Sequence, residues 1–421
     1  MSQRSSLPAP PPAQRWLLLT IVIAMVLRLA VALTYAPHDD SNTYWMMATS
    51  LMSTGHMNDG MGNVAYYSAG YSIFLIPFFW LFGASPLVAH LVNVALGGGC
   101  VWLTYLVGRH VLPNWRWALA AASVWAVYPV SILYSAYFAK ENLMIPLLIL
   151  QLLLVLRYPM SKRPLLSAFI LGALYGFELI TGAAILATGL LIGLVILGYR
   201  LWPMNHLVGR LRPALLAAFG CVIAVGPWLA YTTHELGTPV LTTNGGFNLY
   251  LGNNPEATGY QIGIEDTPIG PDWHDLKSRL GEVEAMSLLG DLAKDYIKTH
   301  PARTAELSIK KLVYLWWPPV QSGKGSESLL EEAVRLVWLA FYSLIIPLSL
   351  VPLLRPKNLT RELLVCFGTV ALYCAPYMLT YVVYRYRLPA MPIMVILAVY
   401  GAQQLYAAYS DRRTRQQTEP A

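Results

Sequence analysis

The sequence predicts an all-α, multi-pass membrane protein with about 10 transmembrane helices. Hydrophobic residues make up 56% of the 421 residues, charged residues make up only 12%, and the mean hydropathy is +0.49. A single water-soluble domain could not bury so much apolar surface. Basic residues stand at the ends of the apolar runs rather than along one amphipathic stripe, which is a signal of membrane topology and does not indicate nucleic-acid binding.

Ten apolar segments are predicted to cross the bilayer, which places both termini on one side. They are 16–35, 86–108, 115–135, 142–157, 164–180, 182–199, 213–233, 332–354, 361–383 and 388–408. The apolar stretch 69–82 has 14 residues, too few for a full span of about 20. We leave open whether it is an extra crossing or a re-entrant segment.

The basic residues predict the orientation. With ten crossings, 16 Lys and Arg residues fall on the side of the termini and three fall in the short loops opposite. Cytoplasmic loops carry such an excess, so the side with 16 is predicted to be cytoplasmic. Those residues are Arg4, Arg15, Arg109, Arg116, Arg157, Lys162, Arg163, Arg200, Arg210, Arg212, Arg355, Lys357, Arg361, Arg412, Arg413 and Arg415. The connections on the opposite side are predicted to lie outside the cytoplasm.

Four parts are expected along the chain. These are an N-terminal transmembrane catalytic module (1–233) with a first periplasmic loop (36–68), a periplasmic segment (234–330), C-terminal transmembrane helices (331–410) and a cytoplasmic tail (411–421). The four Cys residues lie in apolar runs and have neither disulfide nor zinc spacing.

The periplasmic segment 234–330 is expected to be mostly helical. Two amphipathic helices are predicted, one over 282–299 and one from Pro301 to the tandem Trp316 and Trp317. Before them, Gly and Asn residues at 244–246 and 252–255 predict turns with positive φ.

The first periplasmic loop has no Lys or Arg and contains the adjacent acids Asp39 and Asp40. Helical spacing continues from the second acid over five positions: Asp40, Tyr44, Ala48, Leu51 and Gly55. This predicts an interfacial helix with Asp40 at its start, where the helix dipole favours the ionised carboxylate that a general base needs. The alternative is that both acids are solvated loop or capping residues.

Two further charged pairs lie on the same outer side. Lys140 and Glu141 are predicted between two spans, and Arg385 and Arg387 before the last one. Ionisable residues at the membrane edge are candidates for function, and Arg binds phosphate through paired donors. The alternatives are a surface ion pair for the first pair and interfacial anchoring for the second.

Four other residues are weaker candidates. Glu178 lies within a span, near its outer end, and Arg28 lies within the first span. Arg28 could bind a phosphate or pair with an internal acid. His56 and Asp59 could form part of a metal site, although such residues are more often ordinary polar loop residues.

Several segments together resemble the GT-C superfamily of polyprenyl-phosphate-sugar-dependent membrane glycosyltransferases, which includes the protein mannosyltransferases and lipid A aminoarabinose transferases (family 39-like enzymes). After Asp-x3-Tyr-x3-Ala-x6-Gly, which begins at Asp40, the matching segments are AGYSIFLIPFF (69–79), GPW (226–228), NGGFNL (244–249), GNNPEATG (252–259) and RYRLPAMP (385–392).

This resemblance implies a GT-C-like fold and an inverting transfer of a single sugar from polyprenyl phosphate to a cell-envelope lipid, glycan or protein. By position, Asp40 matches the family's catalytic aspartate, and the transfer is implied to take place on the periplasmic face. The expected location is therefore the bacterial inner membrane, with the active site facing the periplasm. Asp39 and Glu141 are the other predicted catalytic residues, which could orient the acceptor or hold a divalent ion. The predicted donor-phosphate ligands are Arg385, Arg387 and Lys140, and the predicted substrate contacts are Tyr44, Tyr67, Asn244 and Asn253. A divalent cation, Mg or Mn, is an open expectation, with Asp40, Glu141 and His56 as candidate ligands. Lipopolysaccharide modification is the expected process.

Two alternatives remain. A transporter or flippase is expected to have inverted repeats and broken helices with charges near mid-membrane. The sequence has no such repeat, and most candidate charges lie at the outer edge. An O-antigen polymerase or ligase also handles polyprenyl-linked glycans, but the early acid pair followed by a helix favours the single-sugar transferase.

Overall fold

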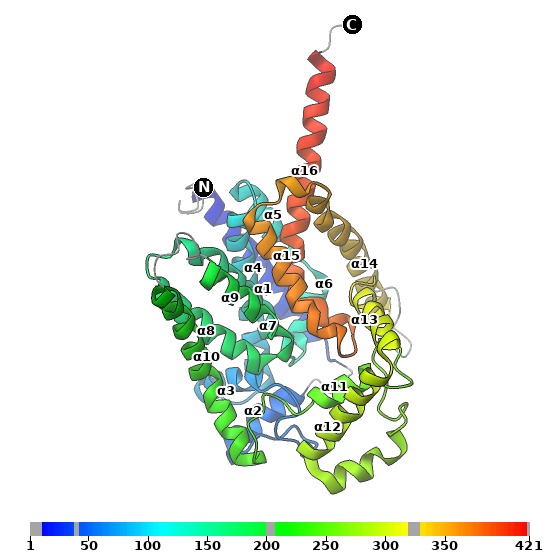
Figure 1. Cartoon of the computed structure of the whole chain (residues 1–421). Coiled ribbons are helices and arrows are strands. Elements are labelled where there is room, and N and C mark those ends of the chain that lie inside the picture. Colours follow the sequence, from blue (N-terminus) through cyan, green and yellow to red (C-terminus); the bar gives the residue numbers. More distant parts are fainter. Residues whose placement is uncertain (1–10, 38–41, 199–206, 319–328, 419–421) are drawn as a thin grey trace.

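The computed structural model describes residues 11–37, 42–198, 207–318 and 329–418 (Figure 1). Within these ranges the chain folds into sixteen α-helices joined by loops and 3-10 turns. The same residues form no β-strand, only one isolated bridge between Tyr260 and Val382. The predicted all-α class is therefore confirmed.

The first eight helices are α1 (Pro11–Thr34), α2 (Thr43–Thr54), α3 (Gly70–Phe82), α4 (Pro86–Val111), α5 (Trp115–Ala126), α6 (Pro129–Leu133), α7 (Glu141–Arg157) and α8 (Pro164–Thr181). The other eight are α9 (Thr188–Gly198), α10 (Leu207–Leu236), α11 (Gly245–Gly252), α12 (Trp273–Thr299), α13 (Pro301–Leu315), α14 (Leu329–Leu350), α15 (Arg361–Cys374) and α16 (Met391–Thr418).

Seven helices of the described ranges are long and apolar enough to cross a membrane, and α5 with α6, bent by 56°, would make eight. The multi-pass class is confirmed, but the expected count of about 10 is not. Two predicted spans form shorter helices. A 3-10 turn at Ala183–Ile185 precedes α9, and a 3-10 turn at Ala375–Met378 follows α15. Pro376 has no N–H to continue α15, which explains why that helix stops early.

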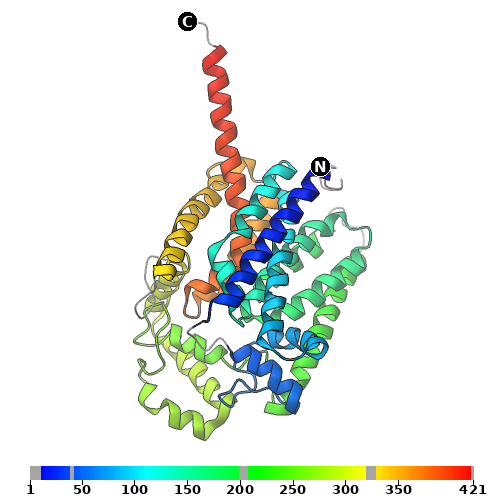
Figure 2. The ribbon, with the colours of Figure 1, turned by 180° about the vertical axis from the view of Figure 1, so that it is seen from behind.

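The helices form an elongated bundle with two distinct ends (Figures 1 and 2). The start of α1 and the end of α16 lie at one end, while α2, α11 and α12 lie at the other. An even number of crossings requires the termini to share a side.

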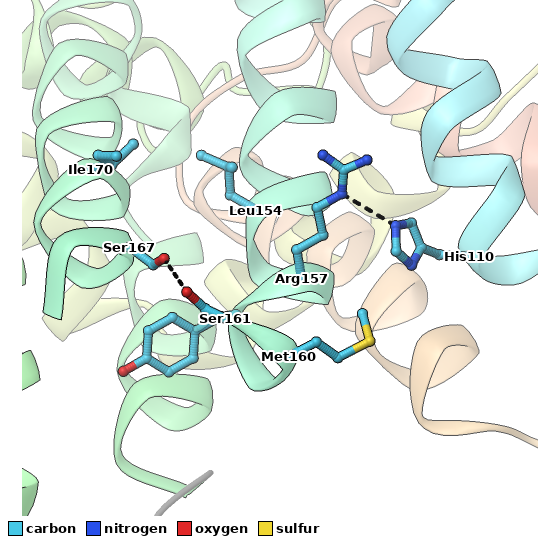
Figure 3. Close-up of a pocket in the computed structure, with 8 residues that line it drawn as sticks. His110, Leu154, Arg157, Met160, Ser161, Ser167 and Ile170 are labelled. Atoms are coloured by element: carbon cyan, nitrogen blue, oxygen red, sulfur yellow. Dashed lines mark hydrogen bonds between the residues drawn. The ribbon is translucent and has the colours of Figure 1, made fainter. Parts of the chain in front are cut away.

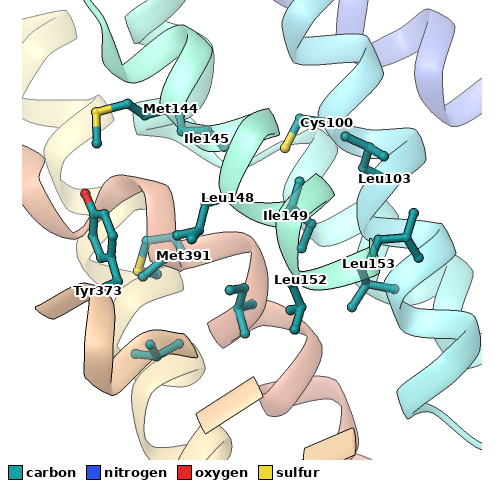
Figure 4. Close-up of a cluster of buried hydrophobic side chains, with 14 of the residues drawn as sticks. Cys100, Leu103, Met144, Ile145, Leu148, Ile149, Leu152, Leu153, Tyr373 and Met391 are labelled. Atoms are coloured by element: carbon teal, nitrogen blue, oxygen red, sulfur yellow. The ribbon is translucent and has the colours of Figure 1, made fainter. Parts of the chain in front are cut away.

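Helix α7 lies at the centre of the bundle and is buried over most of its length (Figure 4). Its Leu148 and Leu152 lie in one buried cluster with Cys100 of α4, Tyr373 of α15 and Met391 of α16. Lipid tails are as apolar as these side chains, so burying the side chains gives little hydrophobic gain within a bilayer. Close packing between the helices holds them together instead.

Some helix pairs depend on glycine for close approach. A Cβ atom at Gly70 of α3 would overlap Thr181 of α8. Small residues at helix contacts are typical of membrane proteins because they let two backbones meet.

The two predicted amphipathic helices are confirmed. Helix α12 is kinked at Gly281, where φ is 77°, and its second part matches the predicted helix over 282–299. Helix α13 begins at Pro301, as predicted, and ends at Leu315, one residue before the tandem Trp residues at which it was predicted to end.

The prediction of turns at 244–246 and 252–255 is right for Asn244 and for residues 253–255, but wrong for the glycines and for their positive φ. Residues Gly245–Gly252 form helix α11, and none of these glycines has positive φ. Two of them are required for packing instead. A Cβ at Gly246 would overlap the Met286 carbonyl of α12, and one at Gly252 would press on the backbone of Thr380.

Candidate active site

Glu141 and Arg385 come together at one end of the bundle. Glu141 is the first residue of α7, and Arg385 lies in the 3-10 turn η9 (Tyr384–Ala390) that precedes α16. The Arg385 Nε atom lies 3.8 Å from Glu141 Oε1. The Glu141 side chain is 7% exposed, whereas that of Arg385 is 53% exposed. The acid is thus buried at a helix start, where the dipole favours its charge, and the cation remains accessible.

Lys140 adds a second cation beside this pair. It occupies the N-cap position of α7 and is half-buried. Loss of water contact lowers the pKa of Lys140, and the negative charge of Glu141 opposes that change. The positive charge of Arg385 also lowers the pKa of Lys140. Among the described side chains of this group there are two cations and one acid, and the two cations suit an anionic ligand.

Helix α2 brings Tyr44 to this charged group. The helix packs on α3, with Ala48 fully buried in a cluster that includes Tyr71 and Leu75. It ends at Gly55 in the left-handed region, so a helix after the acid pair is confirmed. Its start differs from the prediction, because the N-cap is Asn42 rather than Asp40 and the first helical residue is Thr43. Burial, followed by the charge of Glu141, raises the pKa of Tyr44.

Aromatic rings extend from Tyr44 toward the extramembrane segment. The ring of Tyr44 lies 5.9 Å from that of Tyr67, and the ring of Tyr66 lies 4.9 Å from that of Tyr67 and 5.7 Å from that of Phe247 in α11. The aromatic wall therefore joins the first loop to α11. Faces of this kind stack well on sugar rings and apolar chains.

A second set of tyrosines supports the η9 turn. Tyr386 stacks on Tyr377 with ring centroids 4.7 Å apart, and Tyr373 donates a hydrogen bond of 2.9 Å to the Tyr386 carbonyl. The backbone next to Arg385 is thus held from α15, which fixes the guanidinium near Glu141.

Arg387 faces different neighbours from Arg385. It is fully buried, and its Nη1 atom donates to the carbonyls of Leu315 and Trp317 at the end of α13 and to the Tyr342 hydroxyl. The guanidinium lies 4.2 Å from the centre of the Tyr342 ring. Its Nε and Nη2 atoms have no hydrogen-bond partner among the described residues. The structure therefore separates the two arginines that the sequence suggested would act together.

Asp39 and Asp40 lie outside the described residues. The described residues on either side lie near the charged group. Tyr35 contacts Tyr137, three residues before Lys140, with ring centroids 6.2 Å apart. On the other side, Tyr44 is close enough to Glu141 for the carboxylate charge to raise its pKa.

The candidate metal ligands do not gather in the part of the chain that the structure describes. His56 Nδ1 lies 2.9 Å from Glu235 Oε2, and the Asp59 carboxylate accepts from the backbone of Met61 and Asn63. Glu141 is paired with Arg385. No three His, Cys, Asp or Glu residues of the described ranges are placed to share an ion. His56, Asp59 and Glu141 are thus engaged with other groups of the protein, and Asp40, the remaining candidate ligand, lies outside the described residues.

The other predicted substrate contacts differ in their availability. The Asn244 side chain, just before α11, is half-buried and bonds to none of the described residues. Asn253 is buried, donates to the carbonyls of Leu249 and Leu379, and accepts from Lys311. Its hydrogen bonds are thus used within the fold.

Arg28 and Glu178 have contrasting surroundings. Arg28 pairs with no acid among the described residues. It donates to the Ala126 carbonyl, where α5 ends, and to the hydroxyl of Ser131 in α6, which stabilises the bend between these helices. Glu178 is buried without a hydrogen-bond partner in the described structure, beside a small cavity that Tyr373 also lines.

Glu282 is a half-buried connection that the sequence did not reveal. Its carboxylate accepts from the backbone N–H groups of Val64 and Ala65 and from the hydroxyl of Thr243. It thereby ties the first loop to α12 and to the segment before α11. In the sequence, Glu282 is simply an acid at the start of a predicted amphipathic helix, and such a residue is usually solvated.

No protein-family model matches the chain, and no curated protein matches its sequence. Solved structures are similar in fold. The archaeal oligosaccharyltransferase AglB from Archaeoglobus fulgidus, in complex with an inhibitory peptide and a dolichol-phosphate, has a TM-score of 0.52 at 14% identity, covering 97% of this chain and 52% of that one. An Archaeoglobus fulgidus oligosaccharyltransferase in complex with Zn and sulfate gives a TM-score of 0.52 at 14% identity, covering 94% of this chain and 50% of that one.

ArnT from Cupriavidus metallidurans, bound to undecaprenyl phosphate, gives a TM-score of 0.43 at 13% identity, covering 94% of this chain and 79% of that one. The present chain spans about half the length of each oligosaccharyltransferase chain. The two matches to these structures confirm the expected GT-C-like fold.

Proposed function

We propose that this chain is an inverting glycosyltransferase of the bacterial inner membrane. It moves a single sugar from a polyprenyl-phosphate donor to a cell-envelope lipid, glycan or protein on the periplasmic face. The observation that carries the proposal is the accessible Arg385 guanidinium held beside the buried Glu141 and Lys140 at one end of a GT-C-like bundle. AglB, which has a similar fold, was solved with a dolichol-phosphate, a lipid phosphate of the proposed class.

Arg385 and Lys140 would bind the phosphate of the donor. The 3.8 Å distance between Arg385 Nε and Glu141 is longer than a strong hydrogen bond, so the guanidinium keeps donors for a ligand. As the bond between sugar and phosphate breaks, negative charge grows on the leaving phosphate. Cations already in place stabilise that charge without reorganising.

Asp40 is proposed as the general base. It would accept the proton of the acceptor hydroxyl while that oxygen attacks the anomeric carbon on the face opposite the phosphate, which inverts the configuration. The proposal is supported by sequence proximity, because Asp40 precedes Tyr44 by four positions and Tyr44 lies near Glu141 and Arg385. Asp39 and Glu141 would orient the acceptor and Arg385.

The sugar and acceptor would lie along the aromatic wall. Tyr44 and Tyr67 provide ring faces, and Asn244 provides an amide that no described residue engages. We assign catalysis to the transmembrane module 1–233 with its first loop, and acceptor recognition to segment 234–330. Modification of lipopolysaccharide is the proposed process.

The decisive experiment tests the base in a purified sample. Asp40→Asn keeps the shape of the side chain but cannot accept a proton at neutral pH, so turnover should fall by roughly 10²-fold or more. Asp39→Asn is the matched control and should lose less. If only the Asp39→Asn variant is inactive, the general base is Asp39 rather than Asp40. Full activity in both variants would refute the acid-pair mechanism.

The same assay separates the alternatives. A flippase transfers nothing in detergent, where no second compartment exists. An O-antigen polymerase or ligase would yield products that gain a glycan chain, so the mass added to the acceptor distinguishes it from a single-sugar transferase.

A further inference from the structure

A cavity of about 430 Å³ lies at the far end of α7 from Glu141 (Figure 3). It opens between the last turns of α4 and α7 and the first turns of α8. Helix α7 has 17 residues, so roughly 25 Å of helix separates this cavity from the candidate active site. The lining residues are His110, Leu154, Arg157, Tyr158, Met160, Ser161, Ser167 and Ile170.

One side of the cavity is polar and cationic. Arg157 Nε lies 3.3 Å from His110 Nε2, and no described residue accepts from the two terminal nitrogens of Arg157 (Figure 3). The charged groups that act on His110 are Arg157, Arg109 and Glu362, which leaves the rim positive. None of the described residues that line the cavity is acidic.

Two hydroxyls complete the polar side. Ser161 Oγ and Ser167 Oγ lie 2.6 Å apart (Figure 3). In such a pair one hydroxyl donates to the other, and the second O–H remains available for a ligand oxygen. Arg157 and this hydroxyl together can therefore hold a phosphate.

The remaining wall is apolar and faces the outside of the bundle. Ile170 is 44% exposed and Met160 is 53% exposed. Leu154 lies between Ile170 and Arg157 (Figure 3). A free inorganic anion gains nothing from such a wall, whereas an acyl chain does. The surrounding loops carry the basic residues that predict the cytoplasmic side, where anionic lipids are attracted.

We propose that this cavity binds one anionic glycerophospholipid of the inner leaflet. The lipid phosphate lies against Arg157 and the Ser161–Ser167 pair, and an acyl chain runs along Leu154, Met160 and Ile170. The site is separate from the proposed sugar-transfer centre, so its test does not depend on that activity.

The test is native mass spectrometry of the purified full chain, titrated with phosphatidylglycerol or with phosphatidylcholine of the same acyl chains. The wild type should retain one phosphatidylglycerol at least about tenfold more tightly than phosphatidylcholine, since a hydrogen bond to a charged group commonly contributes a factor of this size. Arg157→Gln should remove the preference. Arg116→Gln, an exposed basic residue on the same side but outside the cavity, should keep it.

A second variant covers the case in which Arg157→Gln fails to fold. Ser167→Leu fills the cavity without changing charge and should also abolish retention, while the elution profile reports folding. Equal binding of the two lipids would overturn the proposal. So would equal loss in the Arg157→Gln and Arg116→Gln variants, or displacement of the lipid by millimolar inorganic phosphate, which would indicate a small-anion site.

Discussion

At the scale of single residues, Arg385 and Arg387 have different surroundings although one residue separates them. Positions i and i+2 of a 3-10 turn point in different directions, because the turn repeats every three residues. Arg385 is directed to Glu141 and remains accessible, whereas Arg387 is buried against the carbonyl end of α13. The first arrangement suits ligand binding, and the second stabilises a helix end.

Replacing each arginine by Lys should separate the two roles. Arg385→Lys keeps the charge but loses the planar donors, so transfer should fall by about tenfold or more with little change in thermal stability. Arg387→Lys should instead lower stability by about 1–3 kcal/mol, because buried carbonyls lose their donor. Donor kinetics and thermal unfolding in detergent measure both effects. If both variants lose activity equally and keep their stability, Arg387 binds the donor phosphate together with Arg385, and the two roles are not separate.

Lys311 predicts a pH dependence of stability. The side chain is fully buried, and burial lowers its pKa to about 8. Below pH 8 both folded and unfolded states hold the proton. Between pH 8 and the unfolded value of about 10.4, only the unfolded state does, so stability rises with pH. From pH 8 to pH 10 the free energy of unfolding of the wild type should rise by on the order of 2 kcal/mol relative to that of Lys311→Met, which is measured as a rising apparent Tm. A constant difference would contradict this linkage.

The sequence could reveal Glu141, Lys140 and Arg385 because charged residues beside long apolar runs are conspicuous. It could not reveal which arginine faces the acid, since that depends on the 3-10 turn. Nor could it reveal Glu282, whose partners Val64 and Ala65 are more than 200 positions away.

At the scale of elements, the first loop and α12 act as one unit around Glu282. Two backbone N–H groups and one hydroxyl donate to its carboxylate, and Thr243 N also donates to the Ala65 carbonyl. The aromatic wall from Tyr44 to Phe247 crosses the same boundary. The position of α11 relative to α2 therefore depends on this contact.

Glu282→Gln should loosen that contact, because the amide NH₂ group faces donors where the carboxylate accepted them. The amides of Val64 and Ala65 should exchange about tenfold faster with deuterium, and transfer activity should fall with them. Glu284→Gln, an exposed position on the same helix, is the control. Unchanged exchange in Glu282→Gln would show that the loop is held elsewhere.

Element types were largely predictable, because apolar length and helical periodicity define the spans, α2 and the two amphipathic helices. The failures at α11 and α15 have different causes. Gly246 and Gly252 serve packing against distant backbone, which no local signal shows. The early end of α15 depends on Pro376 within an apolar run that otherwise continues to Val383.

At the scale of the whole molecule, the two ends of the bundle have different chemistry. One end holds Glu141, Arg385 and the aromatic wall. The other holds the Arg157 cavity, and the chain near it carries most of the basic residues. Both proposals require the first end to be periplasmic and the second to be cytoplasmic, an orientation that rests on the distribution of Lys and Arg.

Single cysteines placed at exposed positions test that orientation in intact cells. Asn58 and Glu256 represent the end of the bundle with Glu141, while Lys162 and Arg413 represent the opposite end. A membrane-impermeant maleimide should label the first two, and the last two only after the cells are lysed. The native Cys residues are unpaired, three of them buried and Cys221 half-buried, so replacing all four removes background at small structural cost. Labelling of a cysteine at position 162 in intact cells would show that the orientation is the reverse of the predicted one. The proposed donor site would then face the cytoplasm, and the lipid cavity would face the outside.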